Sequence, residues 1–385
     1  MNAKEPRLEI DRRLFLGGAG TLGTLLALPR TFAKAAVSER RQERHSVWVD
    51  AQGVIDGFEP GVSDQYVLGE RLAAALGERH LDAMSITIGT VGNGPDRLRL
   101  ALDDLARIDR LVAAYPSLLS KIEGAADIKA ARRGGRLGLI YNFQDTSPLE
   151  GDAGNVAKFA ARGIRVMQLT YNRRNLAGDG CLEVADAGLT EFGRDVIGAM
   201  EEARVLLDLS HGGPRTIAEA IEASRQPMAI THSACRDLVD WPRNTWDIEM
   251  RALADKGGVF GVFLMPFLRH RGQPGPDDFY RHLDHAVNIC GEDHVAIGTD
   301  NPLLGYEIDD TSRRQHRENH EARVARGIAA PGEQPDVLLY VEGYNGADRF
   351  ERIAADLRRR GWTSNRIDKI LGRNFARLLG EVWRD

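Results

Sequence analysis

The sequence predicts a (β/α)8 TIM barrel, an α/β fold, for almost all of the chain. Eight short apolar runs rich in β-branched residues follow one another, and amphipathic stretches separate them, which is typical of repeated βα units. The length of 385 residues suits one such barrel. A doubly wound open sheet is the alternative, but the sequence has no glycine-rich phosphate-binding fingerprint after the first run.

The expected strands are residues 47–50, 84–88, 137–143, 166–171, 205–210, 228–232, 259–264 and 294–300. Between them, residues 98–115 are expected to be helical because apolar residues recur at three- and four-residue spacing. Residues 190–203 form a second expected helix, with Thr190 as its N-cap. Residues 303–345 break the alternation and predict an extended loop region over the barrel mouth, whereas residues 349–383 are expected to be helical again.

The first 35 residues have the pattern of an export signal and are set apart from the fold. Arg12 and Arg13 precede an apolar stretch that runs to Leu28, and residues 33–35 form a small-x-small cleavage signal. The arginine pair resembles a twin-arginine signal, which predicts recognition by the twin-arginine export machinery and a periplasmic location. An amphipathic N-terminal helix is the alternative. Residues 36–385 are expected to form a single barrel domain.

Composition excludes some classes of partner and site. The formal net charge of -5 and the pI near 6.1 argue against a nucleic-acid partner, which would require a basic face. No apolar run is long enough to span a bilayer as a mature helix. Cys181, Cys235 and Cys290 are far apart in sequence, so they do not form a zinc-binding cysteine motif. Buried, unpaired thiols are expected, with one disulfide left open.

Polar residues follow several expected strands, at the end of a barrel where active sites gather. These residues are Gln144, Tyr171, Asn172, His211, His232 and Asp300. A single histidine at a strand end is commonly structural, but two histidines on adjacent strands converge at a distance that zinc can bridge. Together with Asp300, which is placed to accept a proton or bind a substrate amine, they predict a metal-dependent active site.

Several motifs together resemble the membrane (renal-type) dipeptidases, peptidase family M19. They comprise Asp208–His211, Thr231–Ser233, Gly188–Gly193, Pro242–Asn244, Ile297–Asp300 and Ile370–Phe375. The similarity is good over roughly residues 160–380 and poor in the first third. The resemblance implies a TIM barrel of the metallo-dependent hydrolase type and a dipeptide as substrate. A homodimer is left open.

The resemblance also implies a role for each matching residue. The family binds two zinc ions that share a bridging Glu. One zinc takes a His-x-Asp pair from the first strand, and the other takes two histidines that match His211 and His232. Arg243, with Asn244, is expected to hold the substrate carboxylate, and Asp300 to lie near the scissile bond. Tyr171 stands where the family has a histidine that polarises the substrate carbonyl.

The sequence departs from the family pattern at the metal ligands. The His-x-Asp pair is absent: one alignment puts Gln52 and Val54 there, and another puts Phe58 and Pro60. The bridging position holds Gln144, a neutral amide that cannot offset the repulsion between two dications. The sequence therefore predicts at most one zinc ion. His211 and His232 would hold it, with Gln144, Asp145 or Asp300 completing the site.

Two functions remain open at this point. The chain is either a hydrolase of dipeptides or small amides with a reduced metal site, or a non-catalytic binding or tailoring protein on the same fold. The retained His211, His232, Arg243 and Asp300 favour the enzyme. The metal content of the purified protein, measured beside dipeptide hydrolysis, distinguishes the two functions.

Overall fold

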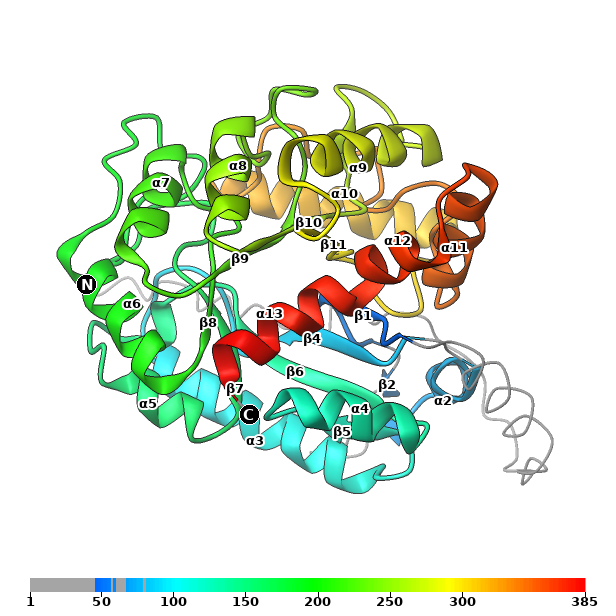
Figure 1. Cartoon of the computed structure of the whole chain (residues 1–385), viewed down its shortest axis with the longest axis horizontal. Coiled ribbons are helices and arrows are strands. Elements are labelled where there is room, and N and C mark those ends of the chain that lie inside the picture. The colour runs from blue at the N-terminus through cyan, green and yellow to red at the C-terminus, as the bar shows by residue number, and fades with distance from the viewer. Residues whose placement is uncertain (1–45, 57, 60–66, 79–80, 385) are drawn as a thin grey trace, which may run out of the picture.

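Eight parallel strands form the predicted barrel in the computed structural model of the chain (Figure 1). The structure describes residues 46–384 except 57, 60–66 and 79–80, so the predicted export signal lies outside the described residues. Around the barrel the strands are β1 (Val49–Gly53), β4 (Ala83–Thr87), β6 (Leu137–Phe143), β7 (Ile164–Gln168), β8 (Leu206–Asp208), β9 (Ala229–Ser233), β10 (Val259–Val262) and β11 (Val295–Ile297). Each expected strand overlaps one of them.

Hydrogen bonds between the end of β1 and the segment that follows β11 close the barrel. The Asp300 amide donates to the Gln52 carbonyl over 2.8 Å, and the Leu303 amide donates to the Val54 carbonyl over 2.8 Å. The Thr299 amide also donates to the Asp50 carboxylate over 2.8 Å. An open, doubly wound sheet would leave these two edges unpaired, so the barrel prediction is confirmed.

Helices surround the barrel (Figure 1). They are α2 (Glu70–Glu78), α3 (Arg97–Ala114), α4 (Ala125–Arg133), α5 (Asn155–Ala160), α6 (Glu191–Ala203), α7 (Pro214–Ala223), α8 (Asp247–Asp255), α9 (Pro276–Cys290), α10 (Asp310–Ala325), α11 (Arg349–Arg359), α12 (Ser364–Asp368) and α13 (Asn374–Trp383). Short helical turns are η2 (Ser147–Leu149), η3 (Pro266–Leu268) and η4 (Lys369–Arg373). As predicted, Thr190 caps α6, because its hydroxyl accepts a hydrogen bond from the Gly193 amide.

The two ends of the barrel interior differ in polarity. Small and branched side chains of the strands pack against Phe375, Leu379 and Trp383 of α13, which crosses one end of the barrel (Figure 1). Nearer the carboxyl ends of the strands, polar side chains occupy the same faces, as Ser85 follows Ala83 and Asn142 follows Ile140. Helix α13 therefore covers the apolar end of the barrel, and the candidate active site is expected at the polar end.

The prediction of a loop over residues 303–345 is wrong in part. The region contains α10, a helix of 16 residues with no buried residue. A helix that is polar all round lacks the apolar periodicity by which helices are recognised in a sequence. Local contacts stabilise it instead: Asp309 caps its start by accepting from the Ser312 amide, and Arg323 near its end pairs with Glu333.

Three smaller features were not predicted or were left open. Strand β5 (Leu119–Lys121) pairs with β6 off the barrel path, and β2 (Phe58–Glu59) pairs antiparallel with β3 (Val67–Leu68). All three cysteines are buried free thiols. Within the described part of the chain, no helix has both the length and the apolar character needed to cross a membrane.

Candidate active site

Two buried imidazoles face each other at the carboxyl ends of β8 and β9. Nε2 of His211 lies 3.0 Å from Nε2 of His232. The exposed fraction is 6% for His211 and 0% for His232. Burial lowers the pKa of both imidazoles well below its usual value, and the nearby Arg243 guanidinium lowers it further. Both rings are therefore neutral at neutral pH, as a metal ligand must be.

A hydrogen bond on the far side of His211 fixes its tautomer. Nδ1 of His211 lies 2.6 Å from Oδ1 of Asn172, whose Nδ2 donates to the Ile328 carbonyl. Since an amide oxygen only accepts, Nδ1 of His211 carries the proton. The lone pair of this neutral ring is then on Nε2, facing His232.

His232 is held in the same tautomer by a buried carboxylate. Its Nδ1 lies 2.8 Å from the Thr231 hydroxyl, which donates its own hydrogen to Asp208 over 2.6 Å. The hydroxyl oxygen must therefore accept from Nδ1, so the lone pair of His232 is also on Nε2. Asp208 further accepts from the Ser210 hydroxyl over 2.7 Å and from the Thr231 amide over 3.0 Å. The motif around Asp208 thus orients the second imidazole.

The opposed lone pairs fit one metal ion. Two imidazole nitrogens that both present lone pairs at 3.0 Å repel each other, and a cation bound between them removes that repulsion. Zinc commonly takes such neutral imidazoles, each oriented by a hydrogen bond from its other nitrogen. Among the described residues, however, no third His, Cys, Asp or Glu joins the pair. The remaining ligands would have to be water, an amide or the substrate.

The position of the family's first-strand ligands does not fit a second metal ion. A register shift between Asp50 and Gly53 interrupts the pairing of β1 with β4. The Gln52 amide donates to the Thr87 hydroxyl over 3.1 Å and accepts from the Asn142 amide over 3.0 Å. These side chains form a hydrogen-bonded network. Because all of them are neutral, they offer no negative charge to a dication. In the alternative alignment, Pro60 lies outside the described residues.

Asp145 and Gln144, the predicted additional ligands, follow β6. One Asp145 oxygen accepts from the Ser147 amide over 2.9 Å, and the other accepts from the Gly92 amide. The carboxylate therefore caps the local turn, and it does not form a cluster with the two histidines. Burial raises the pKa of Asp145. The Gln144 side chain is half-buried, and its backbone carbonyl accepts from Gln168 over 2.6 Å.

Tyr171 and Asp300 lie at the same end of the barrel as the imidazole pair. The Tyr171 ring stacks on His211 with ring centroids 4.3 Å apart and an angle of 26° between the planes. Burial raises the pKa of Asp300 to about 6, although the Arg243 and Arg323 guanidinium groups oppose the rise. At neutral pH its carboxylate is therefore mostly ionised and close to its pKa, as a proton acceptor should be. His211 and Asp300 both adopt left-handed backbone, with φ of 64° and 55°.

Arg243 presents an unpaired donor to the same region. Its side chain is buried, and Nη2 donates to the His232 carbonyl over 2.9 Å. Its Nη1 atom is buried without a hydrogen-bond partner. A buried cation with a free donor is a natural site for a carboxylate. The neighbouring Asn244 is used differently, because its Nδ2 donates to the Val239 and Phe267 carbonyls and so ties two loops together.

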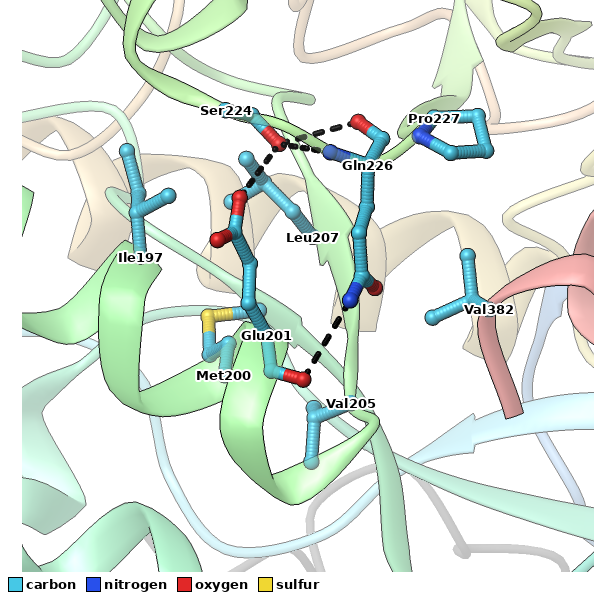
Figure 2. A pocket seen from close by; sticks show the side chains of 9 residues that line it. All are labelled: Ile197, Met200, Glu201, Val205, Leu207, Ser224, Gln226, Pro227 and Val382. Atoms are coloured by element: carbon cyan, nitrogen blue, oxygen red, sulfur yellow. Dashed lines mark hydrogen bonds between the residues drawn. The ribbon is translucent and has the colours of Figure 1, made fainter. Parts of the chain in front are cut away.

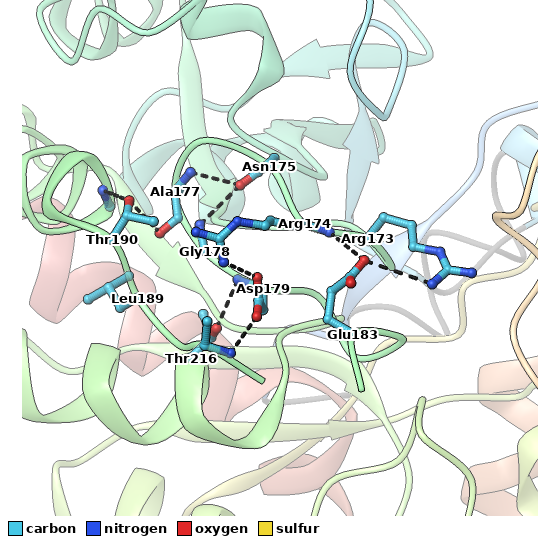
Figure 3. Close-up of polar contacts among 12 residues, drawn as sticks. Arg173, Arg174, Asn175, Ala177, Gly178, Asp179, Glu183, Leu189, Thr190 and Thr216 are labelled. Carbon is cyan, nitrogen blue, oxygen red and sulfur yellow. Dashed lines mark hydrogen bonds and ion pairs between the residues drawn. The ribbon is translucent and has the colours of Figure 1, made fainter. Parts of the chain in front are cut away.

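The loop after β7 is built from its own polar contacts (Figure 3). Asp179 pairs with Arg174 and accepts from the Ala187 amide, while its own amide donates to Thr216 over 3.1 Å. Arg173 approaches Glu183 at 3.8 Å. These contacts give a fixed shape to a loop that runs from Tyr171 at the mouth to the start of α6.

Sequence reasoning missed Arg323 and Glu333. Both belong to the region expected to be an extended loop, and their spacing carries no signal that they pair. Arg323 belongs to the last turn of α10. The positive charge of its guanidinium acts to lower the pKa of His211, Tyr171 and Asp300 at the mouth.

A small cavity elsewhere in the molecule is not the active site. It measures about 10 Å³ and lies among α6, α13 and the segments that lead into β8 and β9 (Figure 2). Its lining includes Val205 and Pro227, which precede those strands, so it is at the opposite end from the histidines. Such a volume has room for about one water molecule and not for a substrate.

Comparison with known proteins decides the family. The family model of membrane dipeptidases (peptidase family M19) matches residues 69–314. The chain belongs to this family. The matched part of the chain includes His211, His232, Arg243 and Asp300, and it ends within α10.

The chain is also similar to individual proteins over most of its length. The solved structure of an amidohydrolase from Pseudomonas aeruginosa is 26% identical, with a TM-score of 0.75 and coverage of 92% of this chain and 100% of that one. An uncharacterized protein from the pqqA 5′ region of Klebsiella pneumoniae is 29% identical, over 75% of this chain and 98% of that protein. The dipeptidase verJ of Clonostachys rogersoniana is 22% identical over 74% of this chain, and the match spans 66% of verJ.

Proposed function

We propose that the chain hydrolyses dipeptides or small amides that carry a free carboxylate, and that it works with one zinc ion. The observation that carries the proposal is the pair of opposed Nε2 lone pairs 3.0 Å apart, next to the unpaired Nη1 of Arg243. The opposed lone pairs fit a cation, and Nη1 of Arg243 fits a substrate anion. Membership in a dipeptidase family supports the choice of dipeptides.

Each residue at the mouth has a distinct role in this proposal. His211 and His232 would hold the zinc ion, which when bound would supply polarisation of a carbonyl and activation of water. Arg243 binds the substrate carboxylate and thereby fixes the distance from that carboxylate to the scissile bond. Asp300 accepts the proton that the attacking water loses and delivers it to the leaving amine. Tyr171 donates a hydrogen bond to the carbonyl oxygen.

A single metal ion follows from charge. Two dications in one site carry about four positive charges, which carboxylate ligands usually offset. Here the positions of the bridging Glu and the first-strand pair hold Gln144, Gln52 and Val54, all of them neutral. Even unit charges about 4 Å apart interact by about 4 kcal/mol at an effective dielectric near 20. We expect at most one equivalent of zinc, bound more weakly than in a site with carboxylate ligands.

Elemental analysis of the purified protein, run beside dipeptide hydrolysis, tests the proposal. We expect up to one equivalent of zinc, lost on His211→Ala, and slow hydrolysis that disappears with it. The triple variant Gln52→His, Val54→Asp and Gln144→Glu should raise both the zinc content and the rate. Two tightly held equivalents in the wild-type protein would contradict the single-site assignment.

One observation favours a second function, a binding protein without catalysis. The two histidines have no third His, Cys, Asp or Glu beside them in the described part of the chain. A non-catalytic protein would still bind dipeptides through Arg243. Calorimetry with a dipeptide, run beside an assay for released amino acids, distinguishes the two functions. Binding without release of amino acids, even at saturating zinc, would favour the binding protein.

A further inference from the structure

The segment that contains α10 connects two opposite sides of the barrel mouth. It leaves the barrel after β11, and the Asn301 side chain ties its two ends together by donating to the Leu339 carbonyl over 2.9 Å. Its middle reaches the loop after β7, where the Arg173 side chain donates to the Gly327 carbonyl over 2.8 Å. Between β11 and β7 lie β10, β9 and β8 on one side of the barrel and β1, β4 and β6 on the other. Residues 301–339 therefore form a cover that spans the mouth.

Polar contacts give the helix of this cover its place. No residue of α10 is buried. Nε2 of His316 lies 3.1 Å from the Gln334 carbonyl oxygen. Nε and Nη2 of Arg323 each donate to the Glu333 carboxylate over 2.8 Å. A helix without buried apolar surface separates from its surroundings at a lower free-energy cost than the core elements do, so the cover is suited to open for a substrate.

One side-chain amide joins the cover to the imidazole pair. Nδ2 of Asn172 donates to the Ile328 carbonyl over 3.0 Å, and Oδ1 of Asn172 accepts from Nδ1 of His211 over 2.6 Å. The Cys181 thiol donates to the same oxygen over 3.5 Å. The exposed fraction of Asn172 is 1%, so bulk water does not compete for these contacts. The cover and the first of the two histidines thus share one buried hydrogen-bonded group.

We propose that Asn172 is a positioning residue that couples closure of the cover to the orientation of His211. In the closed cover, the Ile328 carbonyl holds the amide with its oxygen directed at Nδ1 of His211, and the Nε2 lone pair then faces His232. A hydrogen bond at one end of an amide polarises it and strengthens the bond at the other end. Zinc binding at Nε2 would make Nδ1–H a stronger donor, so zinc binding and closure should favour each other. This last step rests on the proposed function.

Hydrogen exchange of residues 323–329, followed by mass spectrometry in the zinc-free full chain at pH 8, tests the role of Asn172. Asn172→Asp keeps an acceptor for His211 but removes the donor to Ile328, so exchange should become roughly 3- to 10-fold faster. His211→Leu removes the donor to Asn172 at nearly constant volume, and exchange should again be faster. His232→Leu is the matched control: His232 is oriented by Thr231, so exchange should keep the wild-type rate.

A second measurement adds zinc. In the wild type, saturating zinc should slow the exchange of residues 323–329 by roughly fivefold or more. The effect should disappear in Asn172→Leu, which can neither accept from His211 nor donate to the cover. Arg173→Met is the matched variant, because it removes the bond to Gly327 and leaves Asn172 in place. Its exchange should start faster than that of the wild type, and zinc should still slow it.

The outcomes separate this inference from the proposed function. Unchanged exchange in zinc-free Asn172→Asp or His211→Leu, or an equal increase in His232→Leu, overturns the coupling through Asn172. Zinc that binds to the wild type without slowing exchange overturns it as well. A wild-type protein that binds no zinc overturns the proposed function, and the zinc-free exchange rates still decide whether Asn172 joins the cover to His211.

Discussion

At the scale of single residues, the proposed carboxylate site at Arg243 predicts which substrates the protein accepts. Its unpaired Nη1 predicts that a free carboxylate contributes much of the binding energy. Arg243→Lys should raise KM for a dipeptide roughly 10- to 100-fold, since a hydrogen bond to a charged group is worth about 1.5–3 kcal/mol. Steady-state kinetics on a dipeptide and on its C-terminal amide provide the measurement. An equal effect on both substrates would contradict the carboxylate contact.

Glu249 gives a prediction about stability and pH. The residue is buried in α8, its Oε2 atom has no partner, and burial raises its pKa to about 7 from 4.5. The folded chain thus binds a proton on Glu249 more tightly than the unfolded chain does. The free energy of unfolding therefore falls as the pH rises from about 4.5 to 7. Glu249→Gln removes the ionisable group and should raise Tm at pH 8 by at least roughly 2–4 °C. Thermal unfolding at pH 5 should show a smaller gain.

At the scale of elements, two similar carboxylate contacts join neighbouring strands. Asp208 of β8 receives the amide and hydroxyl of Thr231 over 3.0 and 2.6 Å. Asp50 of β1 receives the amide and hydroxyl of Thr299 over 2.8 and 2.6 Å. Only the first contact continues to His232, a proposed zinc ligand. Variants at the two aspartates therefore distinguish an effect on zinc binding from an effect on the fold.

Asp208→Asn should therefore weaken zinc binding roughly 10- to 100-fold, as expected when the hydrogen-bond support of a ligand is lost. Asp50→Asn should lower Tm and leave zinc affinity within about threefold of the wild type. Competition with a chelator of known affinity measures zinc binding in both variants. Equal losses of zinc affinity would show that the contact stabilises the barrel and does not orient His232.

Close approach of strands around Thr231 requires glycine at one position of β10. A Cβ atom on Gly261 would lie 1.9 Å from the Thr231 carbonyl oxygen, which is backbone and cannot move without shifting His232. Gly261→Ala should abolish soluble expression or lower Tm by more than roughly 10 °C, because strain in a packed core costs several kcal/mol. Gly198→Ala, in open space on α6, should instead stabilise by up to about 1 kcal/mol. Thermal unfolding of the two variants is the comparison.

At the scale of the whole molecule, the barrel could be predicted because its strands are buried on both faces. Burial on both faces produces continuous apolar runs such as Leu137–Phe143, and the structure reproduces that strand with the same ends. Helix α10 could not be predicted, since it buries nothing and depends on the Arg323 pair. His211 and His232 were recognisable from strand ends and motifs. The capping role of Asp145 depends on the Gly92 amide, 53 residues away.

The route of the chain in the cell remains a prediction. We propose export by the twin-arginine machinery, because Arg12 and Arg13 stand before an apolar stretch and a cleavage signal. Replacing both arginines with lysine should leave the uncleaved precursor in the cytoplasm, whereas replacing Arg40 and Arg41, beyond the cleavage signal, should not. Cell fractionation with immunoblotting measures this. Normal export of the Arg12→Lys and Arg13→Lys variant would rule out this route.

The left-handed backbone at His211 and Asp300 lowers the stability of the fold at two residues that the proposed activity requires. Such backbone costs about 1–2 kcal/mol at a residue with a Cβ atom, and glycine avoids that cost. Substituting glycine at either site would therefore relieve this backbone cost, and it would also remove a proposed zinc ligand or a proposed proton acceptor. Directed evolution for heat resistance alone would accumulate these changes and yield a more durable, inert barrel. A screen that also selects for turnover would retain both strained residues.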